Sequence, residues 1–191
     1  MKPSKARGRF WLRTECQLDQ AEEKRSRFEP DQVIKLLKEK GYRDPFFQAD
    51  SKDRVILVDR KTGAPLVMDE GLIDEIAKKI GLLSGKWIVF VESGFVDELW
   101  SKIEKLVSEG RIWSAKISTP AYPWVSEGKR VICVYTRNYL DEKDVMDTRN
   151  VLKENGIEDE LSYKPDIYTI LGIYPDNMKG FHLNRVTRYA S

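Results

Sequence analysis

Apolar and polar residues follow two different periods along this chain, and the period changes from stretch to stretch. Strict alternation is typical of β-strands, whereas apolar residues at spacings of three and four are typical of amphipathic helices. The alternating stretches predict strands over residues 54–59, 64–68, 86–91, 112–119 and 131–136. The helical spacing predicts helices over residues 31–40, 70–80, 95–107 and 141–155. Residues 161–164 and 167–174 complete the predicted regular structure.

The order of these elements predicts the fold class. Most of the predicted strands are joined by hairpins or by single helices that return to a neighbouring strand. We therefore expect an α+β fold, in which one curved, mainly antiparallel sheet is backed by about three helices on one face and is open on its concave face. With 191 residues, the chain has room for one sizeable core and an extension. We expect a basic, charged N-terminal arm over residues 1–29 and a single α+β domain over residues 30–191.

The composition limits the possible ligands and the cellular compartment of the protein. The formal net charge is only +2, so any affinity for nucleic acid or phosphate must come from a local cluster of cations. No apolar run approaches the roughly 18 residues of a membrane span, and the basic N-terminus lacks the apolar stretch of a secretory signal. Cys16 and Cys133 lie far apart in the sequence and form no disulfide framework. We expect a cytoplasmic protein without a membrane partner.

Histidine and cysteine are scarce, which argues against most catalytic and metal sites. His182 is the only histidine, and it lies in a basic C-terminal tail. One histidine and two scattered cysteines cannot supply the four ligands of a zinc site, and they disfavour Cys/His or Ser/His/Asp catalysis. Residues 81–87 resemble a phosphate-binding loop, but Trp87 stands where a hydroxyl residue is needed. We predict no metal and no cofactor, and we favour a binding module over an enzyme.

The strand over residues 112–119 has the sharpest alternation in the chain. One of its sides is apolar, and the other carries Ser114, Lys116 and Ser118. A lysine between two hydroxyls can hold a phosphate or a carboxylate together with a neighbouring arginine. Alternatively, Lys116 extends from an exposed strand into solvent.

Aromatic residues next to cations form the second candidate feature. Tyr122 and Trp124 lie in the loop over residues 120–128, where they either stack on a base or close the edge of the core. Phe10 and Trp11 lie among lysines and arginines near the N-terminus. That segment is a mobile arm, a strand packed by its two rings, or an arm that contacts nucleic acid.

The peptide Tyr163–Thr169 has an unusual composition. Pro165 forces Lys164 to be extended, and Asp166 is close enough to pair with it. The peptide is either a rigid corner that faces a ligand or a turn tied by a Lys–Asp contact. The full set of candidate ligand-binding residues is Ser114, Lys116, Ser118, Tyr122, Trp124, Arg137, Arg149 and Lys164.

Four segments of the chain carry a family resemblance. They are GKWIVFV at residues 85–91, the stretch 110–118, VICVYT at residues 131–136 and LSYKPDIYTILGIY at residues 161–174. Together, and in this order, they resemble the Bles family, which is named after a basophilic-leukaemia-expressed protein. The resemblance implies a fold similar to the eukaryotic cap-binding initiation factor, a curved antiparallel sheet backed by three helices.

The resemblance also implies two kinds of site. The cap-binding factor holds a methylated guanine between two loop tryptophans and pairs it with an acidic residue. In this chain Trp124 lies in a suitable loop, Tyr122 is the candidate for the second ring, and no Trp-Glu pair occurs. Members of the family also resemble phosphothreonine lyases, in which a lysine removes a proton, a histidine acts as the acid and arginines hold the phosphate. The residues implied by that second resemblance are Lys86 or Lys116, His182, Arg137 and Arg149.

The function predicted from the sequence is a non-enzymatic module that binds a nucleotide or RNA on its concave face. Lys116 and Lys164 would contact phosphate, and Tyr122 and Trp124 would stack on bases. Two alternatives stay open. One is a phosphothreonine-lyase-like or other phospho-group-processing enzyme, and the other is a scaffold whose helices bind a partner protein.

Overall fold

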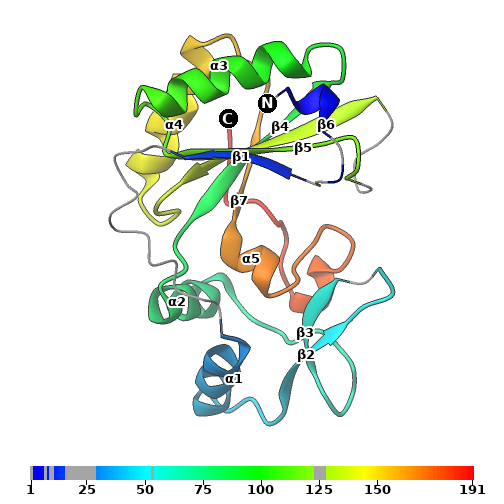
Figure 1. Cartoon of the computed structure of the whole chain (residues 1–191). Coiled ribbons are helices and arrows are strands. Elements are labelled where there is room, and N and C mark those ends of the chain that lie inside the picture. Colours follow the sequence, from blue (N-terminus) through cyan, green and yellow to red (C-terminus); the bar gives the residue numbers. More distant parts are fainter. Residues whose placement is uncertain (1, 7, 9–10, 16–28, 53, 123–127) are drawn as a thin grey trace. The chain divides into compact units, whose positions relative to one another are not determined.

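The computed structural model describes residues 2–6, 8, 11–15, 29–52, 54–122 and 128–191 (Figure 1). Phe10, Cys16 and Trp124 lie outside the described residues. The chain divides into two compact units, each built from stretches that are separate in the sequence. Unit 1 comprises Met1–Lys24, Gly85–Tyr163 and Tyr189–Ser191, and unit 2 comprises Arg25–Ser84 and Lys164–Arg188. The single domain expected over residues 30–191 stays a prediction.

A six-stranded sheet forms the centre of unit 1, with the strand order β1-β5-β6-β4-β7-β8. Its strands are β1 Trp11–Glu15, β5 Ser114–Ser118, β6 Lys129–Thr136, β4 Gly85–Glu92, β7 Ser162–Pro165 and β8 Tyr189–Ala190. β1 pairs with β5, β5 with β6, β4 with β6 and β7 with β8, all in antiparallel register. The predicted α+β fold with a curved, mainly antiparallel sheet is confirmed.

Two long helices, α3 Val96–Ser108 and α4 Glu142–Glu154, cover one face of this sheet (Figure 1). The Asp141 side chain caps α4 by accepting hydrogen bonds from the backbone amides of Lys143 and Asp144 at 3.0 and 3.4 Å. α3 buries an apolar stripe against the sheet, and its members are Val96, Trp100, Ile103, Leu106 and Val107. The sheet and these helices therefore form a two-layer unit with one covered face.

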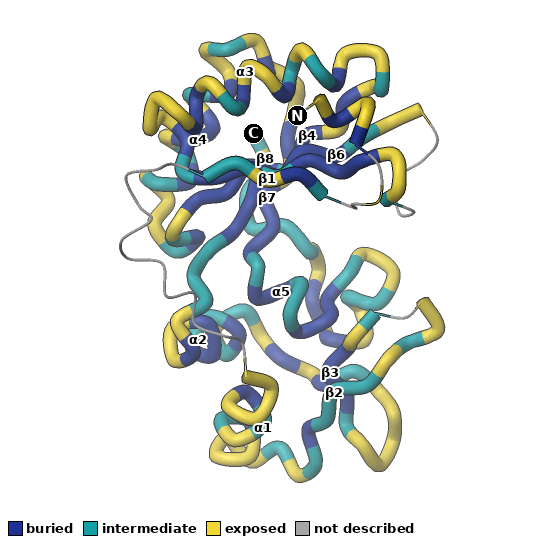
Figure 2. The backbone as a smooth tube through the Cα atoms, in the orientation of Figure 1, coloured by how far each residue is buried: buried dark blue, intermediate teal, exposed yellow. Residues whose placement is uncertain are grey.

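The covered face contains the core of unit 1, which is dark blue in Figure 2. Trp87 on β4 is fully buried, and its indole N–H donates to the carbonyl oxygen of Val145 in α4 at 3.0 Å. The ring of Tyr163 on β7 meets Trp87 edge-on, with 5.2 Å between centroids. The Tyr163 hydroxyl also hydrogen-bonds the hydroxyl of Thr136 on β6 at 2.5 Å. Aromatic packing and a satisfied polar tip thus join β4, β6, β7 and α4.

Unit 2 contains three helices and a two-stranded sheet. Its elements are α1 Pro30–Glu39, β2 Pro45–Ala49, β3 Val55–Asp59, α2 Glu70–Ile80, α5 Asp166–Ile170 and the 3-10 helix Met178–Phe181. α2 has the predicted bounds; Asp69 caps its start, and Gly81, at φ 69°, ends it in the left-handed conformation. The strand predicted over residues 64–68 is reduced to an isolated antiparallel bridge between Pro65 and Val58. The amide of Asp59 donates to the carbonyl oxygen of Ala64, and the amide of Leu66 donates to that of Leu57, while β3 pairs with β2.

An ion-pair network in unit 2 links the start of β3 to Asp176. The Arg54 guanidinium donates to Asp176 Oδ1 at 2.9 Å and to Asp50 Oδ2 at 2.5 Å, and the Lys52 ammonium also donates to Asp176 at 2.5 Å. These hydrogen bonds, that of Arg54 first, hold the pKa of Asp176 far below its usual range. Its carboxylate therefore contributes stability that is present above the unfolded-state pKa near 3.8 and is lost as the pH falls through the lower folded-state value.

We expect the Asp176 side-chain carboxyl to remain ionised at pH 3 in the folded protein, because Arg54 and Lys52 stabilise its charge. An NMR titration of the carboxyl carbon measures this directly. Arg54→Met should raise the pKa of Asp176 towards its ordinary value. Arg60→Met should leave it unchanged, since Arg60 pairs with Asp44 at 3.5 Å on an exposed surface. A carboxyl that titrates near pH 4 in the unaltered protein would contradict the assignment.

Candidate ligand-binding face

The sheet face opposite α3 and α4 carries a cluster of cations and aromatic rings. In an antiparallel sheet, residues opposite each other in register point to the same face. Lys86 is opposite Tyr135, Lys116 is opposite Cys133, and Arg13 is opposite Lys116. Trp11, opposite Ser118, lies on the same face. We define the Tyr135 face by Trp11, Arg13, Lys86, Lys116 and Tyr135.

The Tyr135 ring is the centre of this face. The Lys116 ammonium lies 5.7 Å from the ring centroid, the Lys86 ammonium 5.8 Å and the Arg13 guanidinium carbon 5.7 Å. All three distances lie within the roughly 6 Å over which a ring face attracts a cation. The aromatic ring therefore helps to hold three cations from three different strands close together, although their charges repel one another.

Lys116 makes a second and shorter ring contact. Its ammonium lies 4.2 Å from the centroid of Trp11, on the edge strand β1. Trp11 is in turn 4.5 Å from Tyr122, with the two rings inclined at 58°. Lys116 is therefore flanked by Trp11 on one side and Tyr135 on the other, and the loop after β5 supplies a third ring.

The two rings of the Tyr135 face belong to an apolar cluster. Val131, Cys133 and Tyr135 are buried along β6, and Ile88, Trp11 and Tyr122 pack against them. Around Tyr135 this face carries three described cations and the carboxylate of Glu15, which pairs with Arg13. Farther along the strands, Glu92 and Lys129 are opposite each other on the same face. The face therefore combines an excess of positive charge with ring surfaces, and this combination suits phosphate oxygens joined to a planar ring.

Two predicted ligand-binding hydroxyls serve the sheet itself. The Ser118 hydroxyl accepts a hydrogen bond from the amide of Val131 at 2.9 Å, and the Ser114 hydroxyl donates to the carbonyl oxygen of Thr14 at 3.2 Å. Both serines are buried. In register, Ser114 lies between Glu15 and Tyr135, and Ser118 is opposite Trp11. We therefore remove Ser114 and Ser118 from the candidate site.

Arg149 is also a structural residue, because it is fully buried and its guanidinium is committed to backbone carbonyls. It donates to Ile157 at 2.7 Å, to Asp159 at 2.6 Å and to Ser191 at 3.0 Å. Burial lowers the pKa of Arg149, with the carboxylate of Asp159 acting in the opposite direction. This arginine ties the chain after α4 to the last residue of the sequence, so we remove it from the candidate site.

Lys164 belongs to unit 2, where it is buried and donates to the carbonyl oxygen of Ile173 at 2.7 Å. Its ammonium also lies 4.3 Å from the centroid of Tyr174. The predicted partner Asp166 accepts a hydrogen bond from the hydroxyl of Ser84 at 2.7 Å. These contacts favour the interpretation of this peptide as a structural turn.

The remaining predicted residues are placed as follows. Tyr122 contacts Trp11, and the Arg137 guanidinium lies 5.6 Å from the ring of Trp113, whereas Trp124 is not among the described residues. Of the lyase residues, Lys86 and Lys116 lie on the Tyr135 face of unit 1, and His182 lies in unit 2. His182 follows the 3-10 helix Met178–Phe181 and has a left-handed φ of 60°.

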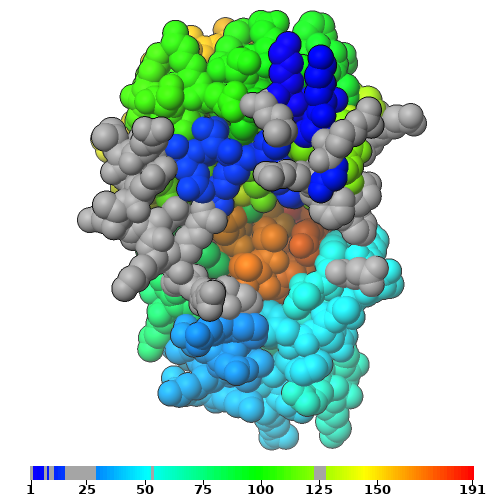
Figure 3. All heavy atoms as spheres, viewed as in Figure 1, coloured from blue at the N-terminus to red at the C-terminus, as the bar shows by residue number. Residues whose placement is uncertain are grey.

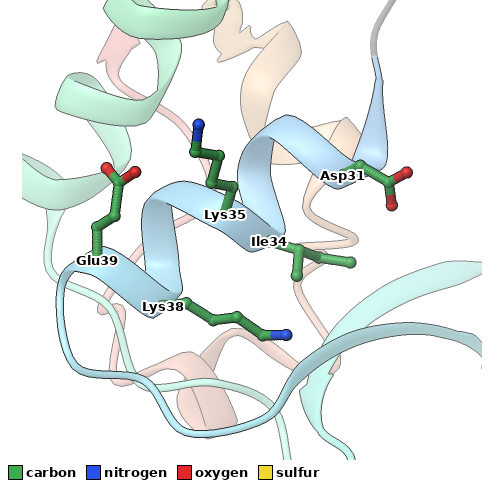
Figure 4. Close-up of a pocket in the computed structure, with 5 residues that line it drawn as sticks. All are labelled: Asp31, Ile34, Lys35, Lys38 and Glu39. Carbon is green, nitrogen blue, oxygen red and sulfur yellow. The ribbon is translucent and has the colours of Figure 1, made fainter.

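Two hollows in unit 2 do not combine cations with aromatic rings as the Tyr135 face does. One hollow, beside the start of α2, is lined by His182 and by the carboxylates of Asp69 and Glu70 and the guanidinium of Arg185. Leu183 and Asn184 complete its lining. Another lies along α1 alone, and its charged side chains project from one helix without converging (Figure 4). Within the described part of the chain, no group of three or more His, Cys, Asp or Glu residues could hold a metal ion. None of the described helices combines the length and apolarity that a bilayer crossing requires.

Comparison with known proteins identifies the family. The sequence model of the basophilic leukemia-expressed protein Bles03 matches residues 42–172. The chain belongs to the Bles03 family. The matched region includes all of β4, β5 and β6 and therefore Lys86, Lys116 and Tyr135, whereas Trp11 and Arg13 precede it. The family resemblance expected from the sequence is confirmed.

Two solved structures are similar to part of this Bles03-family chain. A C. elegans eIF4E-3 in complex with the 4E-binding protein Mextli is 16% identical over 57% of this chain and 59% of its own, with a TM-score of 0.39. A schistosome eIF4E in complex with m7GpppG and 4E-BP is 15% identical over 56% and 58%, with a TM-score of 0.38. The chain thus spans just under three fifths of each of these proteins. At these values the likeness carries no statement about ligands.

The sequence does not predict that Trp11 and Arg13 of β1 belong to the candidate site. For the N-terminal segment, the strand alternative describes Trp11, because β1 begins there and pairs with β5, while Phe10 lies outside the described residues. The available signal was the five-residue stretch WLRTE, in which Trp11 and Arg13 fall on one side of a strand. Tyr135 could have been found from the alternation that places it with Val131 and Cys133.

Proposed function

We propose that this Bles03-family protein is a non-enzymatic module that binds a nucleotide or single-stranded RNA on its Tyr135 face. The observation that carries the proposal is Lys116, held 4.2 Å from the Trp11 ring and 5.7 Å from the Tyr135 ring beside Lys86 and Arg13. Proteins that bind single strands combine cations that follow the phosphates with rings on which bases stack. Both components occur here on one sheet face.

The geometry supports separate roles for the residues. Lys116 is half-buried and presents an ammonium group, which binds phosphate as a point charge with rotatable donors, whereas Lys86 is buried and adds its positive charge beside the Tyr135 ring. Trp11 and Tyr122 present ring surfaces next to them. A base stacked on an aromatic side chain contributes roughly 1–3 kcal/mol whatever the base is. We therefore propose binding with weak sequence preference and strong salt dependence.

Substitution of Lys116 is expected to weaken binding in a salt-dependent way. Lys116→Met keeps the aliphatic stem and removes one phosphate-binding charge, so the affinity for a fluorescein-labelled oligouridylate should fall about tenfold. The slope of log affinity against log salt should become shallower by about 0.7, which is the value for one phosphate contact on a single strand. Fluorescence anisotropy at two or more salt concentrations measures both. Lys102→Met, which alters an exposed lysine of α3 paired with Glu98, is the matched control and should change neither.

Substitution of Trp11 is expected to weaken binding without changing the salt slope. Trp11→Leu preserves an apolar side chain on β1 but removes the stacking surface, so the affinity should fall about tenfold to a hundredfold. The same anisotropy titration separates this result from the loss of charge in Lys116→Met. The decisive variant combines Lys116→Met with Trp11→Leu. If this variant remains folded and binds the oligouridylate as tightly as the unaltered protein, the proposed function is wrong.

The non-enzymatic part of the proposal has its own test. The protein is incubated with a phosphothreonine peptide, and the peptide is then analysed by mass spectrometry for the dehydrated product of a lyase. We expect the peptide to be unchanged. A dehydrated product that disappears in Lys116→Met or Lys86→Met would replace the binding module with the enzyme alternative.

A further inference from the structure

The N-terminal segment Pro3–Ala6 is attached to the start of α3 by one carboxylate. The Ser4 amide donates to Asp97 Oδ1 at 3.0 Å, and the Ser4 hydroxyl donates to Asp97 Oδ2 at 2.6 Å. Pro3 and Ala6 on either side are buried, whereas Ser4 itself is exposed. In Figure 3 the dark blue N-terminal residues lie against the green surface of α3. An exposed serine hydroxyl is therefore the polar part of the attachment.

This attachment bears on the Tyr135 face through β1. β1 is the edge strand of the sheet and pairs with β5 alone. Its first residue is Trp11, which supplies the ring next to Lys116. The pairing with β5 and the anchor at Asp97 therefore hold the same short N-terminal stretch to unit 1. Loss of the anchor leaves an edge strand of five residues held by its ladder with β5 and by the packing of Leu12 and Trp11.

The charges around Asp97 make the anchor sensitive to a negative group on Ser4. The hydrogen bonds from Ser4 hold the pKa of Asp97 below its usual value, with smaller contributions from Lys2 and Lys5. Glu98 follows in the same first turn of α3, so two carboxylates already complement the positive end of this helix. A phosphoryl group on the Ser4 oxygen removes the donated proton and adds a charge of about −1.5 to −2 beside Asp97.

We propose that Ser4 is a phosphorylation site, and that its modification detaches Pro3–Ala6 from α3 and loosens β1; the consequence for ligand affinity rests on the function proposed above. In the reaction, a protein kinase joins the Ser4 oxygen to the γ-phosphorus of a nucleoside triphosphate. The bond from that phosphorus to the bridging oxygen breaks, the diphosphate leaves, and a base of the kinase takes the hydroxyl proton. Ser4 is exposed and lies between Lys2 and Lys5, a charge pattern that suits a kinase selecting basic substrates.

The neighbouring lysines do not rescue the attachment. Lys2 and Lys5 belong to the same segment as Ser4, so they move with it when it leaves α3. Their attraction to the new phosphate acts within the segment and adds nothing to its contact with Asp97. The repulsion between the phosphate and Asp97 acts across the contact, and it therefore decides the outcome.

Hydrogen exchange of the full chain carrying phosphoserine at position 4, incorporated during translation, tests the proposal without any ligand. We expect the backbone amides of β1 to exchange about tenfold faster than in the unmodified protein, while those of α4 stay unchanged. Ser4→Ala lacks the hydroxyl bond but carries no charge, so it should stay close to the unmodified protein. Asp97→Asn combined with phosphoserine should restore slow exchange, because an amide can donate to the phosphate.

Two results would overturn the proposal. One is equal exchange of β1 in the modified and unmodified proteins, and the other is fast exchange that persists when Asp97→Asn removes the repulsion. Oligouridylate titration of the same proteins then tests the link to the ligand, where modification should weaken binding about fivefold or more. If the unmodified protein binds no oligouridylate, the proposed function fails, while the exchange data still decide whether phosphorylation releases β1.

Discussion

Replacing Arg149 with methionine is expected to lower the free energy of unfolding of unit 1 by about 4 kcal/mol, because several buried carbonyl oxygens lose their donor at once. The guanidinium is fully buried and joins Ile157, Asp159 and Ser191 through their carbonyl oxygens. Methionine fills a similar volume but donates no hydrogen bond. The loss therefore exceeds that of a surface charge.

Tryptophan fluorescence during urea denaturation is well suited to this measurement, since all five tryptophans fall within the stretches that form unit 1. Arg111→Met is the matched control, because Arg111 pairs with Glu154 on an exposed surface. That change should cost less than about 1 kcal/mol. Equal effects of the two substitutions would show that Arg149 is not the structural tie described here.

Replacing Gly172 with alanine is expected to destabilise unit 2 by about 3 kcal/mol, the sum of left-handed backbone strain and steric overlap. Gly172 has a φ of 74°, and a Cβ there would lie 2.4 Å from the carbonyl oxygen of Val55 and 2.5 Å from the Cα of Ile56. Both contacts are with backbone, so no side-chain movement relieves them. The change would push apart the turn after α5 and strand β3.

Gly63 offers a matched control within the same unit. It has a φ of 70°, and a Cβ there would meet nothing within 4 Å. Gly63→Ala should therefore cost only the backbone strain, about 1 kcal/mol. Circular dichroism during thermal unfolding, or the dispersion of unit 2 amide signals in NMR spectra, compares the two variants. Similar losses would contradict the close approach of Gly172 to β3.

The regular elements could be predicted where one local period dominates. α2 has the predicted bounds, and Asp141 caps α4 as expected, because the apolar spacing and the cap are both local signals. β2 was missed because Pro45–Ala49 shows no alternation of apolar and polar residues. Residues 167–170 belong to α5, Asp166–Ile170, a short helix after Pro165 that the β-branched composition conceals.

The division into two units could not be predicted from local patterns. Unit 2 is assembled from Arg25–Ser84 and Lys164–Arg188, which are far apart in the sequence. No change of composition marks either boundary, and the four segments that resemble the Bles family cross the second one. Fold class followed from the order of strands and helices, but the grouping of those elements depends on tertiary contacts.

Only the part of the candidate site that lies on β5 could be predicted, because the rest also depends on tertiary contacts. Alternation along β5 places Lys116 on the less apolar face, where it lies beside Trp11 and Tyr135. The pairing of β1 with β5 joins residues about one hundred positions apart, and no local pattern specifies it. Arg149 and Lys164 look like available cations in the sequence, yet both are buried and donate to carbonyl oxygens. A sequence period cannot distinguish these two environments.

Photocrosslinking with a 4-thiouridine oligonucleotide tests the central claim most directly, because it locates the bound strand on the protein. After irradiation and proteolysis, mass spectrometry identifies the peptides that carry nucleotide. Binding on the Tyr135 face predicts adducts on the peptides that contain Trp11, Tyr122 or Tyr135, and their loss in Lys116→Met at moderate salt. Adducts confined to the surfaces of α3 and α4, or to peptides of unit 2, would contradict the claim.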